Sequence, residues 1–371
     1  MSELKTNKIS TNDQNNVAID NALGLKSYTT TARNALTSVA GDMIYNSTTN
    51  KVQFYNGSAW ADTASTLAAS INYLVIAGGG AGGYRTNKSG QTSGGNASAE
   101  SSFFVPFSTN LTVTVGAGGA AAPVANGSNN RNGGTGNNSI FATITSLGGG
   151  GGFEYYSTST NSFNPNSPDV NNKVGLVGSG GGGSWSAGAV GAGAGVGRTG
   201  QGMNGGLGSD IGDGDGSGRT GGGGGGASQV GENGNSELSK VGGDGGDGLS
   251  SDITGSAITR AGGGAGGGKN SGATGGAGGG GAGGYYNNGT SPAGLGTAGT
   301  VNSGGGAGAS GIYNTSIVGV AGGSGVVILR WATADATIGA TRTGLTDGNV
   351  QTTGSDSYIV FTAGTGTITF S

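Results

Sequence analysis

The chain of 371 residues contains no cysteine and no histidine. Without cysteine it has no disulfide framework, no thiolate nucleophile and no cysteine-based zinc site. The lack of histidine removes the commonest general base, metal ligand and neutral-pH switch. Both absences argue against catalysis, so we expect no enzyme and no cofactor.

Charged residues and long apolar runs are also scarce. Charged residues make up 9% of the chain and the net charge is −3, with none of the basic stripes that nucleic-acid binding requires. No run of 18 apolar residues is present to span a membrane, and the start, MSELKTNKIS, lacks the apolar region of a secretory signal. We therefore expect no nucleic-acid partner, no membrane insertion and synthesis in a cytoplasm.

Glycine is the residue in excess, and its distribution divides the chain into three segments. Three of the 91 glycines lie in residues 1–70 and six in 332–371, so the other 82 lie in 71–331. Such a change of composition predicts an N-terminal attachment or trimerisation segment, a glycine-rich domain and a C-terminal segment of β-strands. In the first segment, residues 43–45 and 52–55 flank a polar turn and predict a β-hairpin.

The stretch INYLVIAGGGAGGYR (71–85) places Gly78, Gly80 and Gly83 on the G-x-G-x-x-G spacing of dinucleotide-binding loops. That fingerprint needs a helix after the third glycine, with the pyrophosphate at its N-terminus. Here the chain continues as poor helix formers, and the same glycine texture recurs downstream. We therefore interpret these glycines as structural.

Other motifs give weaker signals. Lys269 follows a glycine run as in a P-loop, but Asn270 stands where a Ser or Thr must hold magnesium. The stretch GGDGGDGLS (242–250) fits one copy of a calcium-binding nonapeptide with Asp247 as ligand, although that motif works as stacked copies. The alternative is solvated turns with Asp between glycines, which also suits a second acidic cluster, Asp210, Asp213 and Asp215. The sequence leaves calcium binding open.

The glycine tracts alternate with strand patterns, which argues against a disordered linker. Polyproline-II helices have three residues per turn and no internal hydrogen bonds, so a bundle of them bonds between neighbours. Glycine lets such helices approach closely. The strand residues predicted to form the apolar core are Phe103, Phe104, Phe107, Val113, Val115, Ile328 and Trp331.

The ordered blocks of the middle segment are INYLVIAGGGAGG, LTVTVGAGG, SIFATITSLGGGGG, SDITGSAITRAGGGAGGG, GLGTAGTVNSGGGAG and AGGSGVVILRW. They resemble the glycine-rich domain of many phage tail-fibre and bacterial surface proteins and of the anaplastic lymphoma kinase ectodomain. The resemblance implies an all-β fold, with a tumour-necrosis-factor-like β-sandwich (jelly roll) and a projecting bundle of polyglycine or polyproline-II helices. It brings no enzymatic activity. MSELKTNKIS resembles marine-phage structural proteins, and residues 41–60 resemble hairpin modules of often trimeric phage fibres.

Aromatic residues collect in the turns expected at the ends of the bundle. On a rigid scaffold they suit stacking on sugar rings or contacts with membrane-protein loops. The alternative is that they cap the bundle or are buried between copies. The candidate receptor-contact residues are Tyr155, Tyr156, Trp185, Tyr285, Tyr286 and Tyr313.

The expected function is that of a virion protein, a phage tail-fibre or tail-tip receptor-binding adhesin. We expect a homotrimer joined to other virion proteins through residues 1–70, with a host surface glycan or outer-membrane protein as its partner. The alternatives are a capsid decoration or head-fibre protein, and a bacterial extracellular adhesin or matrix protein. A depolymerase is disfavoured because glycan hydrolysis needs two paired carboxylates, and the acids here form no such pair.

Overall fold

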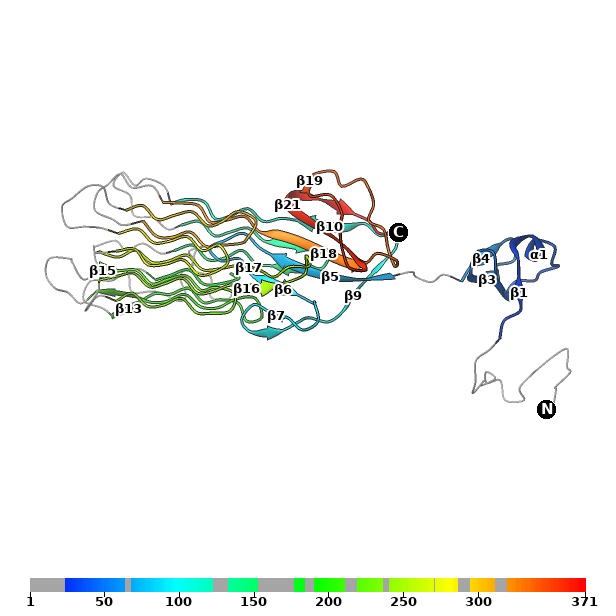
Figure 1. Ribbon diagram of the computed structural model, residues 1–371, viewed down its shortest axis with the longest axis horizontal. Coiled ribbons are helices and arrows are strands. Elements are labelled where there is room, and N and C mark those ends of the chain that lie inside the picture. Colours follow the sequence, from blue (N-terminus) through cyan, green and yellow to red (C-terminus); the bar gives the residue numbers. More distant parts are fainter. Residues whose placement is uncertain are drawn as a thin grey trace, which may run out of the picture. The chain divides into compact units, whose positions relative to one another are not determined.

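The computed structural model describes ten stretches of the chain and divides it into two units, residues 1–67 and residues 68–371 (Figure 1). The described residues are 24–63, 68–122, 133–152, 177–183, 190–210, 219–235, 240–269, 271–285, 294–310 and 319–371.

Unit 1 is a small four-stranded sheet with one short helix. Its hairpin pairs Met43 with Phe54 and Asn46 with Lys51, which confirms the predicted hairpin. The first strand adds to the hairpin in parallel and the last strand antiparallel, giving the order β1-β2-β3-β4. The elements are β1 (Ser27–Tyr28), α1 (Thr30–Asn34), β2 (Met43–Asn46), β3 (Lys51–Tyr55) and β4 (Trp60–Asp62).

The interior of unit 1 is largely polar. Ile44 is the one buried apolar side chain among the described residues of this unit. Buried Gln53 accepts from Arg33 Nη1 at 2.7 Å and from Asn46 Nδ2 at 2.9 Å, and it donates to Asp62 Oδ1 at 2.6 Å. Hydrogen-bonded polar side chains therefore occupy interior positions where a small domain would ordinarily bury apolar surface.

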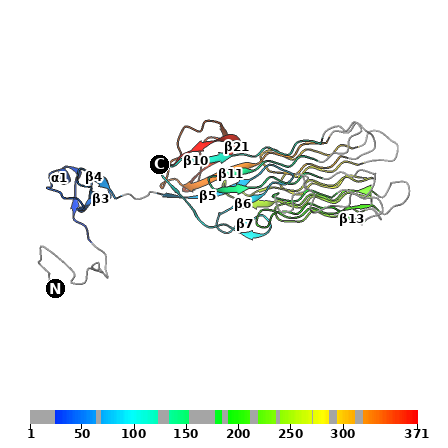
Figure 2. The ribbon, with the colours of Figure 1, turned by 180° about the vertical axis from the view of Figure 1, so that it is seen from behind.

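Unit 2 is built on a ten-stranded antiparallel sheet with the main order β12-β11-β10-β21-β18-β5-β6. β9 pairs with the first half of β5, and β19 and β20 pair with β21. Figure 2 shows β5, β6, β10, β11 and β21 of this sheet from behind. The strands are β5 (Ala68–Ile76), β6 (Tyr84–Thr86), β9 (Phe103–Pro106), β10 (Leu111–Thr114), β11 (Ser139–Phe141), β12 (Ile144–Ser146), β18 (Val326–Ala332), β19 (Leu345–Asp347), β20 (Gln351–Thr353) and β21 (Asp356–Ile368).

The sheet is nearly closed, and this confirms the all-β sandwich. The 13-residue β21 pairs with β18 through residues 356–361 and with β10 through residues 365–368. The C-terminal segment of the sequence prediction thus contributes a central strand of the same sheet. The tumour-necrosis-factor-like topology stays a prediction.

Both faces of the central strands are buried, which explains their unbroken apolar sequences. Along β5, Tyr73 and Val75 point into a first apolar cluster, whereas Leu74 and Ile76 belong to a second one. The first cluster fills the sandwich, where the ring centroids of Trp331 and Phe370 lie 5.2 Å apart. The second cluster is closed from the other side by residues of the glycine-rich segments, namely Ala227, Ile253 and Ala261.

The predicted core residues are buried or packed against the core with one exception. Phe104 is 63% exposed, so its placement in the core was wrong. Alternate residues of a strand face opposite sides, and β9 turns Phe103 and Val105 toward the first cluster instead. Ile328 is buried in the second cluster rather than the first.

The glycine-rich segments run side by side from the sheet to the opposite end of unit 2, where β13 and β15 lie (Figure 1). The backbone N–H groups of successive residues in one segment donate to different neighbouring segments in turn. In residues 221–226, every third residue returns to the same neighbour, with N···O distances of 2.8–2.9 Å. The acceptors, in order, are the carbonyl oxygens of Gly267, Gly183, Glu232, Gly264, Gly180 and Gln229.

This rotation has the period of a helix with three residues per turn and supports the prediction of a polyproline-II-type bundle, which stays a prediction. Close approach leaves no room for side chains: a Cβ on Gly223 would overlap the carbonyl oxygen of Asp244. Other short strands of unit 2 are β7 (Thr92–Ser93), β8 (Ala97–Ser98), β13 (Val190–Ala192), β14 (Gly208–Asp210), β15 (Arg219–Thr220), β16 (Leu249–Ser251) and β17 (Ile258–Arg260).

Candidate functional site

Tyr285 is the one predicted receptor-contact residue that lies within the described part of the chain. The other five, Tyr155, Tyr156, Trp185, Tyr286 and Tyr313, lie outside it. Tyr285 is 39% exposed, and Gly294 lies directly against its ring, since a Cβ there would overlap the ring carbons. The Gly294 N–H donates to the Tyr285 carbonyl oxygen at 2.8 Å, which fixes this backbone beside the ring.

Tyr285 belongs to the end of unit 2 that is remote from the sheet. Gly221, directly after β15, donates to the carbonyl oxygen of Gly267, and Gly268 pairs with Tyr285 in a parallel bridge. Lys269 follows, and its N–H donates to the Lys240 carbonyl oxygen at 2.8 Å. The backbones of these residues therefore lie together, on segments that are far apart in the sequence.

We call Lys240, Lys269, Tyr285 and Leu295 the end surface. Leu295 is 61% exposed and directly follows Gly294, which contacts the Tyr285 ring. The sequence analysis considered Lys269 only as a P-loop residue and did not consider Lys240 or Leu295. The sequence feature that could have identified these three residues is their position at the ends of glycine tracts, where a side chain has room.

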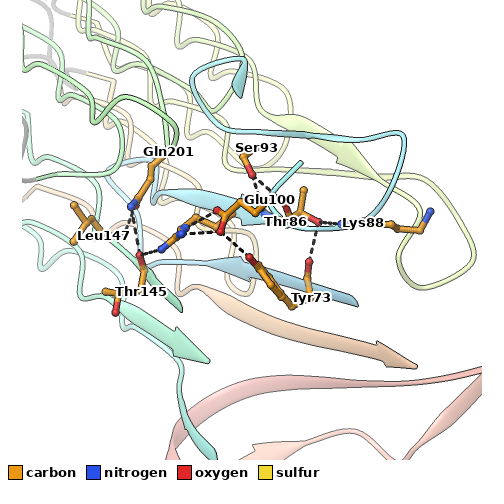
Figure 3. Close-up of polar contacts among 9 residues, drawn as sticks. Tyr73, Thr86, Lys88, Ser93, Glu100, Thr145, Leu147 and Gln201 are labelled. Atoms are coloured by element: carbon orange, nitrogen blue, oxygen red, sulfur yellow. Dashed lines mark hydrogen bonds and ion pairs between the residues drawn. The ribbon is translucent and has the colours of Figure 1, made fainter. Parts of the chain in front are cut away.

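A polar network ties the sheet to the glycine-rich segments (Figure 3). The Glu100 carboxylate accepts hydrogen bonds from Arg85 Nε at 2.6 Å and from Arg85 Nη2 at 2.7 Å. Its Oε2 also accepts from the Tyr73 hydroxyl at 2.6 Å. Arg85 Nη1 and Gln201 Nε2 both donate to the Thr145 carbonyl oxygen. Burial raises the pKa of Tyr73, and the bond to Glu100 acts in the same direction. Because both carboxylate oxygens are engaged, the network holds the fold together.

The two aspartates of the proposed calcium motif have a structural role here. Asp244 and Asp247 lie along an extended segment rather than in turns, as one alternative had placed them. Asp244 Oδ1 accepts from the Thr274 N–H and Asp247 Oδ1 from the Ala277 N–H, both at 2.7 Å. Within the described stretches no three acidic side chains gather to hold a metal ion. Asp213 and Asp215 of the second acidic cluster lie outside those stretches, and the side chain of Asp210 is not described.

The glycines after β5 are built into the packing of segments. A Cβ on Gly78 would overlap the Ala117 carbonyl oxygen, and one on Gly80 that of Gly150. No helix follows Gly83; the chain enters β6 instead. The structural interpretation of this stretch therefore agrees with the observed contacts.

In the part of the chain that the structure describes, no helix is long and apolar enough to cross a bilayer.

Comparison with known proteins gives one match. No curated protein and no solved structure matches the chain. A family model described as a glycine-rich domain matches residues 55–332, which include β5, β18 and all the glycine-rich segments. The chain therefore belongs to the glycine-rich domain family.

Proposed function

We propose that this protein is a non-catalytic phage virion protein, a tail-fibre or tail-tip adhesin that presents the end surface to the host cell. The observation that carries the proposal is that unit 2 has two different ends, one formed by the sheet and the other by the glycine-rich segments. The chain enters at the sheet end through β5, and the glycine-rich segments run from there to the end where β13 and β15 lie (Figure 1). Tyr285 belongs to that end, because it pairs with Gly268, whose neighbour Gly267 bonds to the segment after β15. A contact surface at that end is supported by a rigid, densely hydrogen-bonded scaffold.

The chemistry of the end surface favours a glycan as the host partner. A half-exposed tyrosine ring offers an apolar face on which a sugar ring stacks, and its hydroxyl remains a hydrogen-bond donor. Lys269 directly follows Gly268, the residue that pairs with Tyr285, and adds a cationic side chain to the end surface in a protein whose net charge is −3. We infer a surface polysaccharide that carries acidic groups.

Attachment through residues 1–70 and assembly into trimers complete the proposal. Three copies of a weak site on one particle raise the apparent affinity far above that of a single site. Residues 1–70 would then also join the protein to other proteins of the virion, which is where we place it.

Binding of the purified full chain to host cells tests this function. We expect Tyr285→Ala to lower the fraction bound at least tenfold. Val301→Ala serves as the matched control, because Val301 is 69% exposed and lies in a turn before Gly304, which packs on Ile76 at the sheet end. Equal binding by Tyr285→Ala and the control would contradict the proposed contact surface.

A further inference from the structure

Asn56 and Gly57 begin the exposed turn that joins β3 to β4 in unit 1. The Gly57 N–H has no hydrogen-bond partner among the described residues. Apart from its chain neighbours, a Cβ added at Gly57 would meet only the Ala40 Cβ, at 3.5 Å, so the backbone here is uncrowded. This amide nitrogen is therefore free to react with the side chain that precedes it.

The Asn56 side chain is held back over the Gly57 peptide by three hydrogen bonds. Its Oδ1 accepts from the Ser58 N–H at 3.0 Å, from Ser58 Oγ at 3.0 Å and from the Ala59 N–H at 2.8 Å. When a nucleophile adds to Cγ, this oxygen becomes negatively charged, and donors that already point at it stabilise the charge. The turn thus prepares the carboxamide for attack.

Two other Asn-Gly pairs in the described part of the chain, Asn204–Gly205 and Asn233–Gly234, are locked between glycine-rich segments. In each pair the glycine N–H donates to a backbone carbonyl oxygen, and the asparagine Oδ1 accepts from a backbone N–H. The partners are Gly195 and Gly197 for the first pair, both at 3.0 Å, and Leu207 for the second pair, at 2.8 Å. Their amide nitrogens cannot attack Cγ unless the segments separate.

We propose that Asn56 is a self-modification site that converts to aspartate or isoaspartate without an enzyme. Hydroxide removes the Gly57 N–H proton, and the nitrogen attacks Asn56 Cγ. The bond from Cγ to Nδ2 breaks, and the leaving nitrogen takes a proton from water to form ammonia. Water then opens the succinimide ring at one of its two carbonyl carbons, which gives either aspartate or isoaspartate.

The reaction changes both the charge and the backbone of unit 1. Each product adds one negative charge to a chain whose net charge is −3. Isoaspartate also lengthens the backbone at a turn in which the Asn56 N–H donates to the Ala59 carbonyl oxygen at 3.0 Å. The flanking rings of Tyr55 and Trp60, whose centroids lie 5.6 Å apart, close this turn. Isoaspartate at position 56 therefore weakens the pairing of β4 with β3.

Mass spectrometry of the full chain, aged in buffer at pH 8 and then cut with trypsin, tests the site. Cleavage after lysine and arginine puts the three asparagines on separate peptides, 52–85, 199–219 and 220–240. We expect Asn56 to be converted at least roughly tenfold faster than Asn204 or Asn233, because those two react only after local opening. In urea the three should react at similar rates.

Ser58→Ala removes one of the three donors and should slow the conversion of Asn56 roughly two- to fivefold. Ser47→Ala is the matched control, because Ser47 is an exposed serine in the turn between β2 and β3. It should leave the rate unchanged. The proposal is overturned if the three asparagines react equally fast in the folded chain, or if Ser58→Ala reacts as fast as the native chain.

Discussion

Asp247 Oδ1 accepts a hydrogen bond of 2.7 Å from the backbone N–H of Ala277, 30 residues further along the chain. Three residues earlier, Asp244 stands in the same relation to Thr274. The backbone of this pair of segments bonds in the same register, with Gly245 donating to Thr274 and Gly248 to Ala277. These carboxylates thus supply to the Thr274 and Ala277 N–H groups the acceptor that a backbone carbonyl provides elsewhere in the bundle.

Replacing Asp247 by alanine should destabilise the protein by about 1 kcal/mol, because the Ala277 N–H loses its acceptor. Asp247→Asn keeps a side-chain oxygen at that position and should cost less than half as much. Urea unfolding of both variants measures the difference. Equal losses for the two would show that the negative charge matters and the hydrogen bond does not.

A single methyl group inside the glycine-rich bundle should be far more damaging. Gly223→Ala places a Cβ against the carbonyl oxygen of Asp244, so the segments must separate, and we expect a loss of at least 3 kcal/mol or no folding. Gly348→Ala is the control, because nothing lies within 4 Å of a Cβ there and its φ is not positive. That variant should be neutral or more stable by up to about 1 kcal/mol. Comparable unfolding midpoints for both variants would contradict the close packing described here.

Alkaline conditions should destabilise the protein through its buried tyrosines. Burial raises the pKa of Tyr84 to about 12 in the folded state, whereas an unfolded tyrosine titrates near 10. The unfolded chain therefore loses its proton first, and the stability that is present below pH 10 falls as the pH rises toward 12. We expect a loss of roughly 2–3 kcal/mol from Tyr84.

Chemical unfolding at pH 9 and pH 11.5 measures this loss. Tyr84→Phe should show a shallower fall of stability with pH than the native chain. An unchanged slope would mean that Tyr84 ionises as easily in the folded state as in the unfolded state.

Unit 1 should assemble with other copies of itself. It buries one apolar side chain among its described residues, while Val39 and Met43 are 65% and 49% exposed. We expect sedimentation equilibrium to give about 105 kDa, three times the 35.1 kDa of the chain. Met43→Asp should reduce this mass, and Val350→Asp, an exposed position on unit 2, should not. A monomer mass for the native chain would contradict the trimer.

The sheet was largely predictable from local sequence, and the neighbours of each glycine segment were not. The apolar runs that form β5 and β18 could be predicted as strands, because strands buried on both faces have unbroken apolar sequences. Phe104 was misplaced because both faces of β9 carry apolar residues. The apolar residue Ile253 does not begin a strand; a turn at Gly255, with φ of +92°, separates β16 from β17.

Hydrogen bonds between the glycine segments join residues that no local pattern relates, such as Gly222 and Gly183 or Gly221 and Gly267. The buried network of Tyr73, Arg85 and Glu100 was missed for the same reason. Each of its members looks ordinary in sequence, and only the pairing of β5 with β6 brings Tyr73 and Arg85 together.

The most direct test of the proposed function is immunogold electron microscopy of phage particles, with antibody raised against unit 2. Gold at the tail tip or along tail fibres is the result that we predict. Gold on the head would contradict the adhesin and favour a decoration protein. Bare particles, with gold on cells or extracellular matrix, would contradict a place in the virion altogether.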